Sequence, residues 1–183
     1  MKDTTVREVF PLVNEKDEVI GWAASGKEAL HKSKARHRSV HVFIETFGGG
    51  FILQKKGPNS ENAGTWSSAV SGHVEGDESY EDAAVRETKE ELGRDIDEIE
   101  LERICKVYPC EATNNEFTTL FTYLMDLDKE KIDPAPEEVL EVVRIPFKEL
   151  LVSVDRHKDL YSPAFVALLN MYLGLQNMKG ETT

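Results

Sequence analysis

Three glutamates, Glu87, Glu90 and Glu91, have the spacing i, i+3 and i+4 and could bind a metal together. At about 100° per residue, a helix would place them on one side, where neighbouring like charges repel by a few tenths of a kcal/mol. Arg86 can reach Glu90 but neutralises only one charge, so the group favours a divalent cation. Carboxylate oxygens suit Mg²⁺ or Mn²⁺ that also binds substrate phosphates. The alternative at this point is a solvated acidic helix face.

The sequence around these glutamates carries start and stop signals for a helix. Ser79 is the expected N-cap, and Asp82 three residues later makes a near capping box. Gly93 supplies the expected C-terminal stop. The side of the helix that is expected to pack carries Val85, Thr88 and Leu92. One face of this helix is therefore predicted to pack and the other to bind.

The whole stretch from 72 to 94, GHVEGDESYEDAAVRETKEELGR, resembles the signature of the Nudix hydrolases, GX5EX7REUXEEXGU, where U is a bulky apolar residue. All fixed positions match. The two U positions hold Thr88 and Arg94, which affects packing rather than the carboxylates, and Ile96 is a candidate to take over the packing role. The resemblance implies a Nudix-type α/β/α sandwich with a mixed sheet. It also implies hydrolysis of a diphosphate linkage that depends on Mg²⁺, with Mn²⁺ as an alternative.

The resemblance further implies roles for individual residues. The expected metal ligands are Glu87, Glu90 and Glu91, together with the carbonyl of Gly72. Glu78 is expected to pair with Arg86 and to hold the preceding loop on the helix, which ordinary bidentate geometry also supports. The base that activates the attacking water is left open between a helix glutamate, Glu116 and Glu138.

Segments outside the signature narrow the resemblance to one branch of the superfamily. VNEKDEVIG, LHKSKARHRSVHVFI, FILQKKG and TWSSAVSGHVEGDES resemble the isopentenyl-diphosphate isomerase-like branch, over roughly residues 9–95. That branch contains both diphosphate hydrolases and type I isomerases, and the isomerases use a cysteine immediately before their Gly-His pair. Here Ser71 occupies that position, and a hydroxyl is a poor replacement for a thiol in proton transfer. We therefore expect a hydrolase, with a prenyl-diphosphate isomerase and a catalytically silent ligand-binding module as alternatives.

Several histidines suggest a second metal site. His37 and His73 resemble metal-binding histidines of the isomerases, and with Glu116 they form a possible site. His31 is a third histidine candidate, whereas Asn114 stands where a second glutamate is expected. The alternative for such histidines is a structural, hydrogen-bonded role.

Candidate substrate residues lie near the predicted strands. Lys55 and Lys56 could meet a phosphate, although lysines at a strand end are commonly solvated. Trp66, Phe51 and Tyr123 could border a pocket and stack on a base, although aromatic residues in strands more often pack in the core. The branch resemblance favours a nucleoside diphosphate or a related nucleoside diphosphate-X compound, but these residues select no particular base.

Composition excludes some classes of partner. The chain of 183 residues has a formal net charge of −12, which argues against nucleic acid or an anionic membrane as the main partner. A small phosphorylated substrate can still arrive with its metal. The first residues lack the apolar run of a signal peptide, and no stretch is long and apolar enough for a membrane span, so a cytoplasmic protein is expected. Cys105 and Cys110 are expected to be free thiols, and a homodimer is left open.

The pattern of apolar residues predicts a single domain over 1–183. It would consist of an N-terminal extension (1–35), a core (36–152) and a C-terminal helix and tail (153–183). Strands are predicted over 9–13, 19–23, 36–45, 51–56, 65–70, 99–108, 117–127 and 139–145. Besides the acidic helix, helices are predicted over 26–35 with Ser25 as cap, from Pro146 to 151, and over 163–175, with 178–183 frayed.

Overall fold

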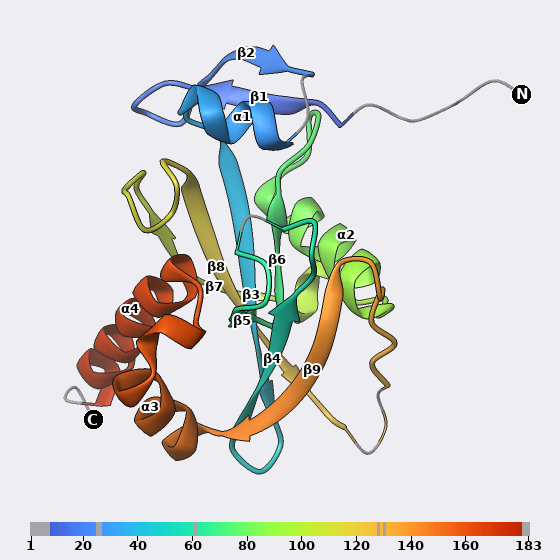
Figure 1. The fold of residues 1–183 in the computed structure, drawn as a ribbon, viewed down its shortest axis with the longest axis vertical. Helices are drawn as coiled ribbons and strands as arrows, with labels where there is room; N and C mark the ends of the chain where they lie inside the picture. Colours follow the sequence, from blue (N-terminus) through green and yellow to red (C-terminus); the bar gives the residue numbers. More distant parts are fainter. Residues whose placement is uncertain (1–7, 25–26, 61, 128, 130, 181–183) are drawn as a thin grey trace, which may run out of the picture.

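A mixed sheet forms the centre of the molecule in the computed structural model, which describes residues 8–24, 27–60, 62–127, 129 and 131–180. The seven strands of this sheet are β3 (Arg38–Thr46), β4 (Gly50–Lys56), β5 (Trp66–Ser68), β6 (Val70–His73), β7 (Glu102–Val107), β8 (Phe117–Met125) and β9 (Val139–Pro146). Strand β3 lies in the middle: it pairs with β8 in parallel and with β4 and β6 antiparallel. Strand β9 extends the sheet on the far side of β4, and β7 on the far side of β8. Figure 1 shows this arrangement.

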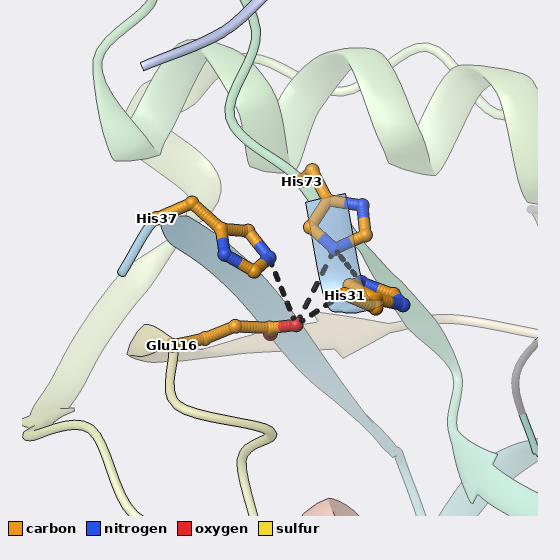
Figure 2. Close-up of side chains that lie close together, drawn as sticks. All are labelled: His31, His37, His73 and Glu116. Carbon is orange, nitrogen blue, oxygen red and sulfur yellow. Dashed lines mark hydrogen bonds and ion pairs between the residues drawn. The ribbon is translucent and has the colours of Figure 1, made fainter. Parts of the chain in front are cut away.

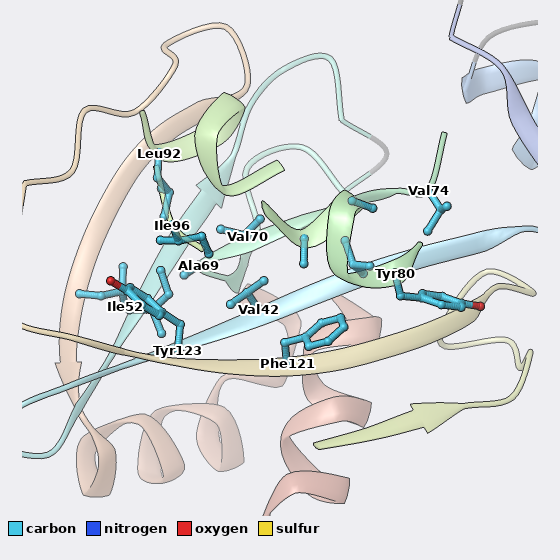
Figure 3. Close-up of a cluster of buried hydrophobic side chains, with 14 of the residues drawn as sticks. Val42, Ile52, Ala69, Val70, Val74, Tyr80, Leu92, Ile96, Phe121 and Tyr123 are labelled. Carbon is cyan, nitrogen blue, oxygen red and sulfur yellow. The ribbon is translucent and has the colours of Figure 1, made fainter. Parts of the chain in front are cut away.

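Helices cover both faces of the sheet because strand residues alternate between two apolar cores. Val40, Val42 and Ile44 of β3 face helix α2 (Tyr80–Leu92) and form the α2-side core. Figure 3 shows part of this core, including Val42, Leu92 and Tyr123. Phe43 faces the other way, into the α4-side core with helices α3 (Phe147–Arg156) and α4 (Pro163–Gly180). The predicted α/β/α sandwich with a mixed sheet is therefore confirmed.

Local signals set the limits of helix α2 as predicted. Ser79 Oγ accepts a hydrogen bond from the Asp82 amide at 2.9 Å, and the Asp82 carboxylate accepts one from the Ser79 amide at 3.0 Å. Gly93 ends the helix in the left-handed conformation, with φ of 66°, and a Cβ there would lie 2.6 Å from the Asp133 carbonyl oxygen. Ile96 is buried in the α2-side core, as its predicted packing role requires.

An N-terminal unit lies beside the start of β3. It consists of the hairpin β1 (Phe10–Val13) and β2 (Val19–Ala23), followed by α1 (Lys27–Ser33). Asp17 in the hairpin turn joins this unit to the core, because its carboxylate accepts hydrogen bonds from Arg38, Tyr80 and Lys106. Burial would raise the pKa of Asp17, but these three hydrogen bonds hold it below its usual value. The predicted cap Ser25 lies outside the described residues.

Some predicted boundaries were wrong. The strand expected over 65–70 is two strands that separate at Ala69, since β5 pairs with β4 and β6 pairs with β3. A 3₁₀ turn at Glu98–Glu100 delays the start of β7 to Glu102. Pro146 ends β9, and α3 continues to Arg156 rather than stopping at 151. Helix α4 includes residues 178–180, which were expected to fray, and 181–183 lie outside the described part. None of the described helices is long and apolar enough to cross a membrane.

Candidate active site and metal centres

A cavity of about 730 Å³ lies where these elements meet, and we call it the central cavity. Its lining comes from α1, β3, the end of β4 and the loop that follows it, β5, β6, α2, the loop over 110–116, the loop before β9 and the start of α4. Segments far apart in the sequence thus contribute to one site.

Three carboxylates on one side of this lining form the carboxylate cluster. One oxygen each of Glu87, Glu91 and Glu138 lies within 4.8 Å of the others. Glu87 and Glu91 are only 3% and 2% exposed, whereas Glu138 is exposed. Buried carboxylates this close are costly unless a cation neutralises them, and hard oxygen donors suit Mg²⁺ or Mn²⁺. The cluster is therefore a fit site for a divalent cation.

Glu91 is held through one of its two oxygens. Its Oε2 accepts hydrogen bonds from the Ser71 amide and from Gln54 Nε2, both at 2.8 Å. Its Oε1 lies 3.6 Å from Lys56 Nζ. Burial raises the pKa of Glu91, and Lys56 and these hydrogen bonds oppose that rise. Because two donors are fixed on Oε2, Oε1 is the oxygen that can bind a metal ion.

Glu87 lies directly against the backbone of Gly72. A Cβ atom built on Gly72 would lie 1.9 Å from the Glu87 carboxyl carbon and 2.0 Å from its Oε1. Gly72 is therefore needed as glycine, because any side chain would occupy the position of the Glu87 carboxylate. Gly72 itself lines the central cavity, as a residue that offers a carbonyl ligand should.

Arg86 connects the loop before α2 to the carboxylates. It donates to Glu78 from Nε at 2.7 Å and from Nη2 at 3.1 Å, so the predicted pairing of these residues is confirmed. Its Nη2 also donates to the His73 carbonyl at 2.7 Å, and Nη1 donates to Glu87 and to Glu90, each at 2.8 Å. The Glu90 side chain is 51% exposed and does not line the central cavity. The structure thus brings Glu87 and Glu91 together at the cavity, whereas Glu90 forms an ion pair with Arg86.

Three histidines and Glu116 form a second group, the histidine site (Figure 2). Glu116 Oε1 lies 3.2 Å from His37 Nε2, 3.4 Å from His73 Nε2 and 3.5 Å from His31 Nε2. His31 comes from α1, His73 from the end of β6, and His37 and Glu116 directly precede β3 and β8. The structure therefore brings together His37, His73 and Glu116, which were predicted for a second metal site, and His31, the third histidine candidate.

The hydrogen bonds and pKa shifts in the histidine site bear on which metal ion it can bind. His37 Nδ1 must donate to the Ala35 carbonyl at 2.9 Å, since a carbonyl only accepts. His37 Nε2 is buried and lies 3.2 Å from the Glu116 oxygen, so it is directed into the site. Burial lowers the pKa of His73, which favours its neutral form. Burial would raise the pKa of Glu116, but His37 and His73 lower it well below its usual range. Imidazole nitrogens together with a carboxylate oxygen are suitable ligands for Zn²⁺ or Mn²⁺.

A strained turn positions Glu116 in this site. Asn114 and Asn115 have φ values of 50° and 67°, and the Glu116 amide donates to the Thr113 carbonyl at 2.9 Å. Asn115 Nδ2 donates to the Lys34 carbonyl at 2.6 Å, which joins this turn to the end of α1. Asn114 lines the central cavity but is not one of the clustered ligands.

The predicted substrate residues divide into two groups. Lys56 lines the central cavity, and its Nζ donates to Ser71 Oγ at 2.8 Å. Lys55 and Trp66 do not line it, because successive strand residues face opposite sides; the Lys55 ammonium lies over the Trp66 ring, 5.6 Å from its centre.

The prediction that Phe51 and Tyr123 border the pocket was wrong. Both side chains are buried in the apolar cores on the two faces of the sheet. Residues that the sequence did not single out line the cavity instead: Ser39, His41, Ser67 and Ser162.

The fold and the site together define an α/β/α protein in which buried carboxylates and a histidine site face one cavity. The family model for the NUDIX domain matches residues 35–165, and the chain belongs to this family. It is 27% identical over 175 residues to isopentenyl-diphosphate delta-isomerase 2 of Aromatoleum aromaticum, covering 92% of this chain and 88% of that protein.

Two further comparisons add a hydrolase and a solved fold. The chain is 29% identical over 120 residues to a Nudix hydrolase of Deinococcus radiodurans, covering 65% of this chain and 69% of that protein. A crystal structure of a Deinococcus radiodurans protein matches with a TM-score of 0.69 at 24% identity, covering 82% of this chain and 90% of that one. Relatives therefore include both hydrolases and isomerases, while the solved structure shows the fold.

Proposed function

We propose that the protein is a metal-dependent Nudix hydrolase that cleaves a diphosphate linkage in a nucleoside diphosphate or a related nucleoside diphosphate-X substrate. The carboxylate cluster at the central cavity carries this proposal. Glu87 and Glu91 are buried, lie one helix turn apart and have Glu138 beside them. Together they could bind a cation that also contacts a substrate phosphate. Ser71, in the place of the isomerase cysteine, supports hydrolysis over isomerisation.

In this proposal Glu87 and Glu91 would hold Mg²⁺ or Mn²⁺ with the Gly72 carbonyl, whereas Glu90, which does not line the cavity, would act through its hydrogen bond with Arg86. The bound ion would neutralise phosphate oxygens during displacement at phosphorus. Lys56, 2.8 Å from Ser71 Oγ, supplies a further positive charge for the phosphate. Arg86 and Glu78 keep Glu87 in position from outside the cavity.

The attacking water needs a base, and we assign this role to Glu138. It belongs to the carboxylate cluster and is exposed at the loop before β9. Glu116, the other candidate outside the helix, has its Oε1 directed at three histidine nitrogens. We assign Glu116 to the histidine site with His31, His37 and His73.

A prenyl-diphosphate isomerase is the second candidate function. The histidine site favours it, because the sequence at His37 and His73 resembles the metal-binding histidines of the isomerases and these residues lie together in the structure. Ser71 counts against it, since its hydroxyl accepts a hydrogen bond from the Lys56 ammonium and is a weak acid in comparison with a thiol.

Replacing Glu91 by Gln tests the hydrolase. The change removes the charge but retains the shape, so we expect phosphate release from nucleoside diphosphates with Mg²⁺ to fall by about 10³-fold or more while the thermal unfolding temperature changes little. Glu98→Gln is the matched control, because Glu98 is exposed in the 3₁₀ turn and should retain full activity. Near-normal hydrolysis by Glu91→Gln would refute the assignment.

A further inference from the structure

Beyond the metal-binding side chains, the central cavity has a wall of neutral polar groups. Ser39 and His41 of β3, Ser67 of β5 and Ser162 before α4 line it, and all four residues are buried. We call these four residues the polar wall. Neither the carboxylate cluster nor the histidine site includes any of them.

Hydrogen bonds hold the polar wall in place. His41 Nδ1 and Ser68 Oγ are 2.5 Å apart, and Ser39 Oγ lies 2.8 Å from Thr118 Oγ1. The hydroxyl oxygens of Ser67 and Ser162 are 3.2 Å apart. A hydroxyl has one donor and two acceptor positions, so each serine retains hydrogen-bonding capacity for a ligand. The wall is therefore already arranged for several hydrogen bonds.

The polar wall carries little charge at neutral pH. Burial lowers the pKa of His41 to about 3, so its imidazole is neutral. Phosphate recognition is better served by the cations elsewhere in the cavity, including Lys56. Neutral donors and acceptors of this kind match the hydroxyl groups of a ligand.

The fold uses Ser162, whose Oγ accepts a hydrogen bond from the Phe165 amide at 3.3 Å at the start of α4, but it does not require polar residues at Ser39 and His41. Ser39, His41 and Phe43 alternate along the same face of β3, and Phe43 packs in the α4-side core with Phe51 and Phe165. The face thus changes from polar to apolar where the strand leaves the cavity. Hydrogen bonds to Thr118 and Ser68 offset the cost of burying Ser39 and His41, and contact with a ligand gives a reason for polar side chains here that apolar packing does not.

The remaining lining is unsuited to a prenyl chain or a stacked base. Among the described residues that line the cavity none is Phe, Tyr or Trp, and the apolar side chains are those of Ala112 and Ala164. The rings that line it are the imidazoles of His31 and His73 in the histidine site and of His41. A prenyl chain would gain about 0.8 kcal/mol per CH₂ group in an apolar pocket, and stacking is worth about 1–3 kcal/mol per base. The cavity offers no apolar surface for a prenyl chain and no Phe, Tyr or Trp ring on which a base could stack.

We propose that the polar wall binds a polyhydroxylated group, a ribose or a hexose, that is attached to the diphosphate of the substrate. The protein then selects substrates by this sugar rather than by a base or a prenyl chain. The inference rests on the hydrolase function proposed above and specifies the class of substrate for the same site.

Four diphosphates test this selection in the presence of Mg²⁺. Uridine diphosphate and ribose 5-diphosphate share the sugar and differ in the base, isopentenyl diphosphate has a prenyl chain, and methyl diphosphate has neither group. We expect kcat/KM for the first two to agree within about threefold, because the base makes no stacking contact, and isopentenyl diphosphate to be no better than methyl diphosphate. A preference above about tenfold for uridine diphosphate over ribose 5-diphosphate, or a preference for the prenyl compound over the sugar diphosphates, would overturn the inference.

The variant Ser67→Ala connects the selection to the polar wall. Loss of one hydrogen bond should raise KM for ribose 5-diphosphate by about 3- to 10-fold and leave methyl diphosphate hydrolysis unchanged. Equal effects on both substrates would contradict a role in sugar binding.

A binding measurement separates this inference from the hydrolase itself. Calorimetric titration of ribose 5-diphosphate with Ca²⁺ reports binding without turnover. If no diphosphate is hydrolysed but Ser67→Ala weakens this binding, the polar wall is supported and only the hydrolase proposal fails. If the wild type hydrolyses diphosphates but Ser67→Ala binds ribose 5-diphosphate normally, the polar wall is refuted and the hydrolase stands.

Discussion

The substitution Gly72→Ala tests whether Glu87 must lie where the structure places it. The new Cβ would be 1.9 Å from the Glu87 carboxyl carbon, whereas carbon atoms in contact stay about 3.5–4.0 Å apart, so the carboxylate must move by roughly 1.5–2 Å. A misplacement of about 1 Å can cost about 10²-fold in rate. We therefore expect kcat/KM to fall at least about 100-fold, which corresponds to about 2.7 kcal/mol of transition-state stabilisation.

The fold should tolerate this alanine. Gly72 is not among the residues with positive φ, and the atoms nearest to the new Cβ belong to the end of the Glu87 side chain rather than to backbone. Gly21→Ala is the matched control, because a Cβ at Gly21 meets nothing within 4 Å. Phosphate release with Mg²⁺ measures activity, and circular dichroism during heating measures folding.

A double-mutant cycle identifies the cause of the loss. If Gly72→Ala acts by displacing Glu87, it should cost less than about twofold once Glu87→Ala has already removed the carboxylate. Activity of Gly72→Ala within about threefold of the wild type would refute the reasoning that the Glu87 carboxylate is needed in this position.

Two further predictions concern the histidines. His37→Ala should remove tightly bound Zn²⁺ or Mn²⁺, whereas the control His157→Ala, at an exposed histidine, should retain it. Elemental analysis of each purified variant after incubation with each metal measures the metal content. Equal metal content in both variants would contradict the histidine site. His41 has a pKa of about 3 when folded and about 6.5 when unfolded, so between these values the unfolded chain binds a proton that the folded protein does not. The contribution of His41 to the free energy of unfolding should therefore fall by about 1.4 kcal/mol for each pH unit of acidification below 6.5. Denaturant unfolding of His41→Asn at a series of pH values should lack this part of the pH dependence. If the free energies of unfolding of the two proteins change with pH in parallel, a buried neutral His41 is contradicted.

Local sequence signals predicted the parts of the fold that depend on neighbouring residues. Ser79, Asp82 and Gly93 define α2 because their hydrogen bonds lie within the helix ends themselves. Glu78 and Arg86 were predictable as a pair for a similar reason, since eight residues separate them across one loop and two helix turns. The gap at Ala69 was not predictable, because only the different partners of β5 and β6 separate these strands.

The candidate site depended more on distant contacts. Glu138 reaches the carboxylate cluster because Gly57 donates a backbone hydrogen bond to its carbonyl at 2.7 Å, a contact between β4 and the loop before β9 that no local pattern indicates. Part of the polar wall is visible as a pattern in the sequence, since Ser39 and His41 alternate with Val40 and Val42. That alternation predicted a strand with one polar face, and the strand is correct. The polar face, however, lines a cavity rather than meeting open solvent.

Phosphorus NMR of a nucleoside diphosphate incubated with the protein and Mg²⁺ shows whether the protein is a diphosphate hydrolase. We expect the two diphosphate signals to be replaced by those of orthophosphate and nucleoside monophosphate, and Glu91→Gln to prevent this change. Unchanged diphosphate signals, together with conversion of isopentenyl diphosphate to its double-bond isomer by the same preparation, would contradict the proposed hydrolase.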